Sequence, residues 1–133
     1  MNKKVWQFVP PKPASASKEY KAQVLSLASQ FLDSTLKPKS ILPPPSSNQL
    51  NYIVDLFAKW HGRRLYLCSK YASPGPNAIS PFFDSPFARL EYVSHDCFHV
   101  SYQRHNGEWV QLHSGLSLSE SLASIVRDPL LLP

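Results

Sequence analysis

The string His95-Asp96-Cys97-Phe98-His99 places two histidines, a cysteine and an aspartate close enough together to suggest a metal site. Zinc takes four histidine, cysteine or acidic ligands in a structural site and three in a catalytic one. If His95 and Asp96 form a turn, only Cys97 and His99 share a strand face, and a third ligand must come from His113, Cys68 or His61. No Cys-x-x-Cys or His-Glu-x-x-His spacing supports such a site. We therefore predict no catalytic residue and no cofactor, and keep Cys97, His99 and His113 as the alternative metal ligands.

A larger polar group is expected on one face of the sheet that these residues enter. Between Phe87 and His113 apolar and polar residues alternate, which places them on opposite faces of strands. The outer face is expected to hold Arg89, Glu91, His99, Ser101, Gln103, Gln111 and His113, opposite Leu90, Val100 and Leu112. A solvated polar face is ordinary for an antiparallel sheet. The alternative is a ligand-binding role for Arg89, Glu91, His99, Gln103 and His113.

The strands that position these side chains are predicted from alternation and turn residues. Three strands span residues 87–113, and Asn106-Gly107 suits a tight hairpin between the last two. The segment Leu50 to Trp60 fits helical and strand periodicity alike. We favour a strand, because His61-Gly62 and the alternation after it predict a hairpin with Arg63 to Tyr71. The prolines of residues 72–86 predict a long loop.

Two helices complete the expected fold. Ser17 can cap a helix over residues 18–36, which Lys37-Pro38 should end, and an extended connector should follow over residues 37–47. Ser117 and Glu120 have capping-box spacing and begin a second helix over 118–127. The order predicts an α+β fold, in which helices cover one face of an antiparallel meander of about five strands over residues 50–113. We expect one domain over 17–133, preceded by an arm over 1–16.

The positive charge of the chain is concentrated near its beginning. Of the net charge of +5, all the excess lies in residues 1–39, which hold seven lysines and two acidic residues. A basic, proline-rich arm of this kind can steer toward an acidic protein, nucleic acid or an anionic membrane surface. The candidate partner-binding residues are Lys3, Lys4, Trp6, Lys12, Lys18, Lys21, Arg63 and Arg64.

The same composition bounds the location and the function class. Two cysteines are too few for a disulfide scaffold, the first residues lack the apolar run of a secretory signal, and no stretch is long enough to span a bilayer, so a cytoplasmic location is expected. The favoured hypothesis is a non-enzymatic interaction module that binds an acidic protein. The alternatives are a nucleic-acid-binding accessory protein and, less favoured, a small metal-dependent hydrolase. An exposed sheet edge could also pair two copies into a homodimer.

Residues 48–131 resemble a bacterial domain family of unknown function. The matching segments are FARLEYV at 87–93, SYQR at 101–104, and Trp109 with the strand that follows it. The sequence departs from the family pattern where Val110, Gln111 and Leu112 replace a His-Arg-Tyr-like continuation, and where the chain ends in LLLP. The resemblance implies an early helix, a proline-rich connector, a meander and a C-terminal helix. It implies no activity.

Overall fold

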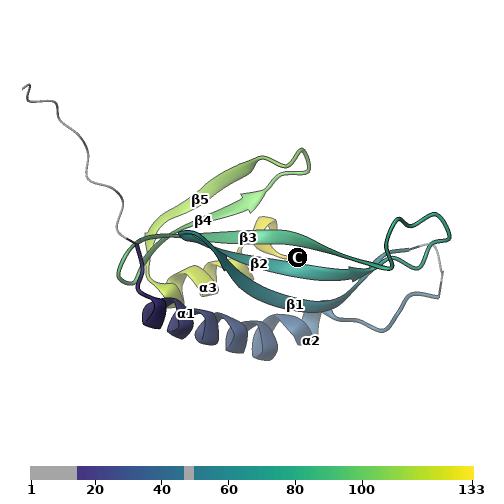
Figure 1. Cartoon of the computed structure of the whole chain (residues 1–133), viewed down its shortest axis with the longest axis horizontal. Helices are drawn as coiled ribbons and strands as arrows, with labels where there is room; N and C mark the ends of the chain where they lie inside the picture. Colours follow the sequence, from purple (N-terminus) through teal and green to yellow (C-terminus); the bar gives the residue numbers. More distant parts are fainter. Residues whose placement is uncertain (1–14, 47–49) are drawn as a thin grey trace, which may run out of the picture.

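The computed structural model describes residues 15–46 and 50–133 and has the predicted α+β fold (Figure 1). Its helical elements are α1 (Lys18–Phe31), the π-helical turn η1 (Leu32–Leu36), α2 (Lys37–Ser40), α3 (Leu118–Arg127) and the 3₁₀ turn η2 (Pro129–Leu131). Its strands are β1 (Tyr52–His61), β2 (Arg64–Ala72), β3 (Phe82–Ser94), β4 (Cys97–Gln103) and β5 (Trp109–Leu116). The strands form one antiparallel sheet in the order β1-β2-β3-β4-β5, which confirms the meander. None of the described helices is long and apolar enough to cross a membrane.

Both long helices begin at the predicted caps. The Ser17 hydroxyl accepts a hydrogen bond from the backbone N–H of Tyr20 at 3.1 Å. At α3, Ser117 and Glu120 each accept a hydrogen bond from the other's backbone N–H, so the capping box is complete. Because a cap satisfies amides that have no partner within the helix, these residues fix where each helix starts.

The prediction that Lys37-Pro38 ends the first helix is wrong, and so is the start of the connector at residue 37. Helical backbone continues through Pro38 to Ser40. In a regular α-helix the proline ring would meet the carbonyl four residues earlier, and its missing N–H would break a hydrogen bond. Here the π turn η1 widens the backbone just before Pro38, and the Lys37 N–H reaches back five residues to the Leu32 carbonyl. Pro38 then occupies the first turn of α2, where proline is tolerated.

The predicted loop over 72–86 is shorter in the structure, because β3 already begins at Phe82. The Leu67–Ala88 pair is followed by the Cys68–Pro86 pair, so Phe87 is an extra residue that forms a bulge. Pro86 therefore lies next to a bulge, a position that accepts proline within a sheet. Strand β4 pairs with β3 only from Ala88 onward, so Pro86 interrupts no hydrogen bonds toward β4. The segment Leu50 to Trp60 is a strand, as favoured, from Tyr52.

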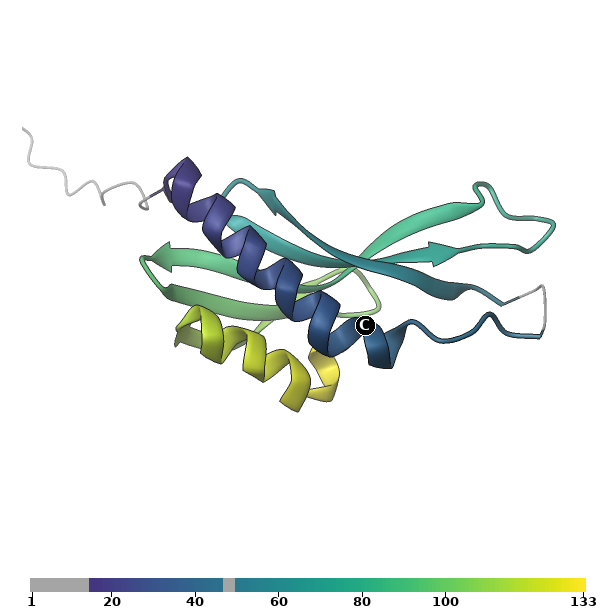
Figure 2. The same cartoon turned by 90° about the horizontal axis from the view of Figure 1, so that it is seen from below.

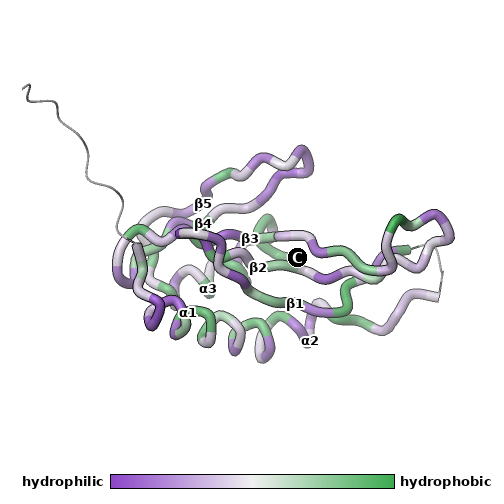
Figure 3. Tube along the Cα trace, viewed as in Figure 1, coloured by the Kyte–Doolittle hydropathy of each residue, from purple (hydrophilic) through white to green (hydrophobic). Residues whose placement is uncertain are grey.

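The core lies between the sheet and the helices, which cover a single face (Figure 2). Helix α1 and η1 contribute one buried side chain per turn, namely Val24, Ala28, Leu32 and Leu36, and α3 contributes Leu118, Leu122 and Ile125. From the sheet, Leu65, Leu67, Leu90 and Val100 are completely buried, and Leu112 is partly buried against the same cluster. The inward direction predicted for Leu90 and Val100 is confirmed. Figure 3 shows that hydrophilic residues concentrate at the tip of the β4–β5 hairpin.

Candidate functional site: the outer face of the sheet

The sheet face opposite α1 and α3, here called the outer face, presents a continuous line of side chains across all five strands. The register pairs Lys59 with Tyr66, Tyr66 with Arg89, Arg89 with Ser101 and Ser101 with Gln111. Directly paired residues in an antiparallel sheet point to the same side. These residues alternate with the buried Leu65, Leu90 and Val100, so they point away from the helices. We call this line the cross-strand row.

Arg89 and two aromatic rings form the centre of this surface. The Arg89 guanidinium lies over the Trp109 ring, 4.7 Å from its centroid, and the Tyr66 ring meets Trp109 edge-on at 5.6 Å. His61 meets Tyr66 in turn, with ring centroids 6.4 Å apart. A guanidinium over an aromatic face is held by the negative charge density of the ring. Arg89 Nε is buried and makes no hydrogen bond within the described part of the chain. The contact with the Trp109 ring is what orients the guanidinium.

The charges of the outer face include one carboxylate shared by two arginines and two cations without a carboxylate partner. Glu91 lies 3.8 Å from Arg63 Nη1 and 3.9 Å from Arg64 Nε, and Arg63 also donates to the Tyr92 carbonyl at 2.6 Å. Lys59 and Arg89 have no carboxylate within 4.0 Å among residues 15–46 and 50–133. Glu91 offsets only one of its two arginines, so the excess positive charge of this face is shared between that cluster and the cross-strand row.

A cavity of about 340 Å³ opens beside the row. It is lined by Lys59, Trp60, His61, Tyr66, Cys68, Asp84 and Pro86. Cys68 is 1% exposed, and this burial raises the pKa of its thiol, with Asp84 adding to the rise and Lys59 opposing it. Because the thiolate is the reactive form, a raised pKa makes Cys68 a poor nucleophile. The raised pKa therefore argues against a nucleophilic role for Cys68 in this cavity.

The alternative metal ligands do not come together. His99 lies on the outer face opposite Glu91, and its Nδ1 accepts a hydrogen bond from the Gly115 N–H at 3.2 Å. The expected position of His113 on that face is wrong, because β5 carries an extra residue there and His113 pairs with the buried Val100. His113 Nε2 instead lies 3.8 Å from Asp128 Oδ2 at the end of α3. No group of three or more metal-ligating side chains occurs in the described residues.

The other predicted residues fall into four groups. Arg64, Arg89, Glu91, His99 and Gln103 share the outer face. Lys21 lies on the helix side, where Nζ donates to the Gly62 carbonyl at 2.9 Å and lies 5.3 Å from the centroid of the Trp60 ring, so it fastens α1 to the β1–β2 turn. Lys18 is exposed in the first turn of α1. Lys3, Lys4, Trp6 and Lys12 of the basic arm lie outside the described residues.

Comparison with known families agrees with the fold. The model of a domain of unknown function, DUF3024, matches residues 15–132, which is nearly the whole chain. The chain belongs to the DUF3024 family. The predicted resemblance to a domain of unknown function is thereby confirmed, over a longer stretch than residues 48–131. No curated protein and no solved structure matches the chain.

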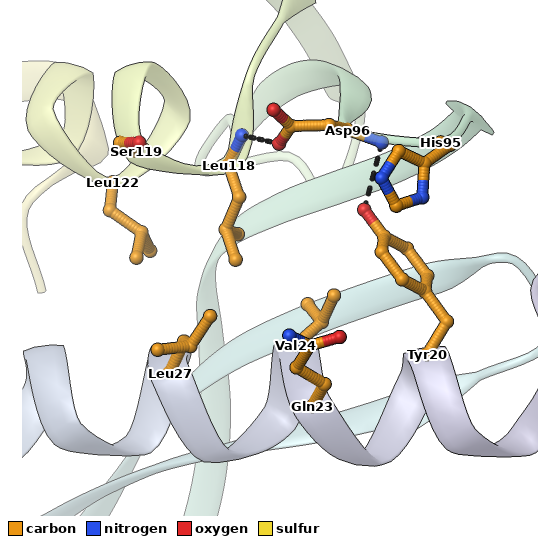
Figure 4. A pocket seen from close by; sticks show the side chains of 9 residues that line it. All are labelled: Tyr20, Gln23, Val24, Leu27, His95, Asp96, Leu118, Ser119 and Leu122. Atoms are coloured by element: carbon orange, nitrogen blue, oxygen red, sulfur yellow. Dashed lines mark hydrogen bonds between the residues drawn. The ribbon is translucent and has the colours of Figure 1, made fainter.

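This DUF3024 domain has a second cavity, of about 350 Å³, where α1, α3 and the β3–β4 turn meet (Figure 4). Val24, Leu27, Leu118 and Leu122 line its apolar part, and Tyr20, His95 and Asp96 stand at its polar rim. The Asp96 carboxylate accepts from the Leu118 N–H at 2.8 Å, and its own N–H donates to the Tyr20 hydroxyl at 2.9 Å. These bonds join three elements of the DUF3024 fold and account for Tyr20 and Asp96 at the rim without a ligand.

Sequence reasoning did not bring Lys59, Tyr66 and Trp109 together at the centre of the outer face. The signal for two of them was present: counting outward from the turn after His61 pairs Lys59 with Tyr66. The contact between Tyr66 and Trp109 had no such signal, because it joins β2 to β5 across the width of this DUF3024 sheet. Periodicity gives the face of a residue and does not give its neighbours on distant strands.

Proposed function

We propose that this DUF3024 protein is a non-enzymatic interaction module that binds an acidic protein partner on the outer face of its sheet. The observation that carries the proposal is the pair of unbalanced cations, Lys59 and Arg89, on either side of Tyr66 in the cross-strand row. Charge complementarity selects partners and accelerates their encounter, so a surface with excess positive charge favours an acidic one.

The residue types at the centre of the surface support a protein partner. Arginine, tyrosine and tryptophan are enriched in protein interfaces and contribute much of the binding free energy there. Arg89, Tyr66 and Trp109 are in contact with one another and only partly exposed. They are held in place before binding, so little conformational entropy is lost when a partner docks.

The basic arm over residues 1–16 is proposed to assist the same binding by attracting the acidic partner. Lys3, Lys4, Trp6 and Lys12 add positive charge to the chain, and exposed Lys18 and Arg64 lie within the domain. An arm of this composition raises the rate of encounter with an acidic protein, in a manner that salt weakens. A cytoplasmic location fits the proposal, since Cys68 and Cys97 are both free.

A second candidate function is binding of single-stranded nucleic acid. The aromatic rings of Tyr66 and Trp109 on an open sheet face favour it, because bases stack on such rings beside a cationic groove. Binding of this kind weakens steeply with salt, since each phosphate contact releases counterions.

One titration separates the two candidates. Fluorescence anisotropy would be measured with a labelled polyglutamate peptide and a labelled oligothymidylate, using the wild type, Arg89→Gln and the control Arg127→Gln. Arg127 is exposed on α3, away from the outer face, so this control removes the same charge elsewhere. We expect the peptide to bind and Arg89→Gln alone to weaken it. Preferential binding of the oligonucleotide would support the second candidate instead.

A homodimer through a sheet edge is also part of the proposal. Strand β1 lies at one end of the sheet, so one side of its backbone has no neighbouring strand within the sheet. Such an edge can pair with a second copy of the chain. Light scattering coupled to size-exclusion chromatography would test this, and a monomeric mass at high protein concentration would rule it out.

A further inference from the structure

The spacing of Lys59 and Arg89 restricts the shape of the acidic segment that could bind both. The two residues are directly paired with Tyr66 from opposite sides, so they lie two strand spacings apart. Neighbouring strands are about 4.8 Å apart, which places the two backbone positions about 9.6 Å from each other. A partner that pairs one carboxylate with each cation needs acidic side chains at a similar spacing on one side of its chain.

A peptide can be extended as a polyproline II helix or as a β-strand, and only the first repeats its side-chain direction at roughly 9.6 Å. A polyproline II helix rises about 3.1 Å per residue and has three residues per turn, so side chains three apart point the same way at about 9.3 Å. A β-strand puts same-side residues about 6.7 Å or 13 Å apart, and both values lie further from the separation of the two backbone positions.

The side chains between the cations fit the same conformation. Tyr66 lies between Lys59 and Arg89, with His61 and Trp109 against its edges. Proline-rich segments in the polyproline II conformation dock on grooves lined by aromatic rings. The cavity beside the row adds Pro86 as further apolar surface.

We infer that the acidic segment recognised by the outer face is a polyproline II helix of the type Glu-Pro-Pro-Glu, lying across β1, β2 and β3. One glutamate pairs with Lys59, the next pairs with Arg89, and the prolines between them pack on Tyr66. This inference rests on the proposed function and specifies its ligand.

The test compares two labelled peptides of identical composition, EPPEPPEPPE and EEEEPPPPPP. Both carry the same charge, and only the first repeats glutamate every three residues. Fluorescence anisotropy would be measured with the wild type, Lys59→Gln, Arg89→Gln and the control Arg127→Gln. The repeating peptide should bind the wild type at least about tenfold more tightly than the block peptide, and Lys59→Gln should remove most of this preference. Arg127→Gln should keep it.

The outcomes distinguish the inference from the proposed function. If both peptides bound equally and binding still depended on Arg89, the inferred three-residue repeat would be wrong, whereas the proposed binding of an acidic partner would stand. No binding of either peptide, with tight binding of oligothymidylate, would overturn both. Arg89 Nε is buried, so Arg89→Gln could disturb the sheet, whereas Lys59 is exposed and carries the test without that risk. Amide chemical shifts on β1 to β3 that do not move with the repeating peptide would also contradict the inference.

Discussion

At the scale of single residues, Asp96 shows most clearly how a turn is fastened to two helices. It is the only non-glycine residue of the described chain with a positive φ, at 51°. Aspartate tolerates this conformation better than most residues, since its short side chain can hydrogen-bond locally. Here the carboxylate accepts from the first amide of α3, and the backbone N–H holds the Tyr20 hydroxyl of α1. One residue thus fixes the β3–β4 turn against both helices.

We predict that Asp96→Ala destabilises the protein by about 2 kcal/mol, with roughly half from the lost amide acceptor and half because alanine lacks the short polar side chain that lets aspartate tolerate positive φ. Asp96→Gly should cost only the part due to the acceptor, and Asp96→Asn should cost less than about 1 kcal/mol, because asparagine keeps an acceptor and tolerates this φ. Urea unfolding of the three variants measures these differences. Equal losses for all three would show that the backbone conformation contributes nothing.

Cys68 should make the stability of the protein depend on alkaline pH. Burial raises its pKa, so the folded chain keeps the thiol proton where the unfolded chain has released it. Above about pH 8.5, the pKa of a free thiol, loss of this proton stabilises the unfolded state relative to the folded one. The free energy of unfolding therefore falls as pH rises past that value. The raised pKa values of Tyr20, from burial, and of Lys37, from hydrogen bonds to Asp33 and Asp55, act in the same direction at higher pH.

Cys68→Ala removes the thiol contribution and should give a shallower decline of unfolding free energy between about pH 8 and pH 10. Its stability at neutral pH can differ from that of the wild type, because the side chain is buried, so the slope is the quantity to compare. Urea titrations at several pH values supply it. Parallel curves for the two proteins would mean that the unfolded thiol titrates no earlier than the folded one.

At the scale of elements, the sequence predicts best where local signals and packing agree. Alternation over residues 98–102 and the capping residues Ser17 and Ser117 describe their elements correctly, because the same side chains that set the local conformation also meet the core or the helix ends. The predicted boundaries of the first helix and of the 72–86 loop are wrong, and both errors involve a proline. A π turn accommodates Pro38 within helical backbone, and a bulge accommodates Pro86 within β3.

The sequence predicts which side of the sheet most residues of the candidate site lie on, but it does not predict where a bulge changes that side. The side of the sheet on which Arg89 and Glu91 lie follows from alternation, whereas the side of His113 depends on an extra residue in β5. A shift of one residue moves every later side chain to the opposite face. Nothing local to Leu112 signals this bulge, since an apolar residue there is compatible with either register.

The capping box of α3 should make a measurable contribution to stability. Ser117→Ala removes the acceptor for the Glu120 N–H and should cost about 1 kcal/mol, which is typical of a lost N-cap. Ser119→Ala is the matched control, because Ser119 is exposed in the first turn of the same helix and should change stability by less than about 0.5 kcal/mol. Denaturant midpoints of the two variants give the comparison, and indistinguishable midpoints would show that packing alone positions α3.

At the scale of the whole molecule, the two faces of the sheet differ in composition and in what covers them. The helix side holds the apolar core, including Leu65, Leu90 and Val100, and it is covered by α1 and α3 (Figure 2). The outer face carries charged and aromatic side chains that contribute little to that core. Substitutions at the exposed Lys59 should therefore alter the proposed binding while leaving the fold intact, which is what a separate recognition surface requires.

The proposed division into an arm over 1–16 and a domain over 17–133 predicts that the domain folds without the arm. A chain beginning at Ser15 keeps the packing of Ala16 against the core and the cap at Ser17. Its Tm should lie within about 3 °C of that of the full chain, since the buried cluster runs from Val24 to Leu131. Its affinity for an acidic peptide should be lower and less dependent on salt, because Lys3, Lys4 and Lys12 are gone. Calorimetry and anisotropy measure the two quantities, and a fall in Tm beyond about 5 °C would place the domain boundary earlier in the chain.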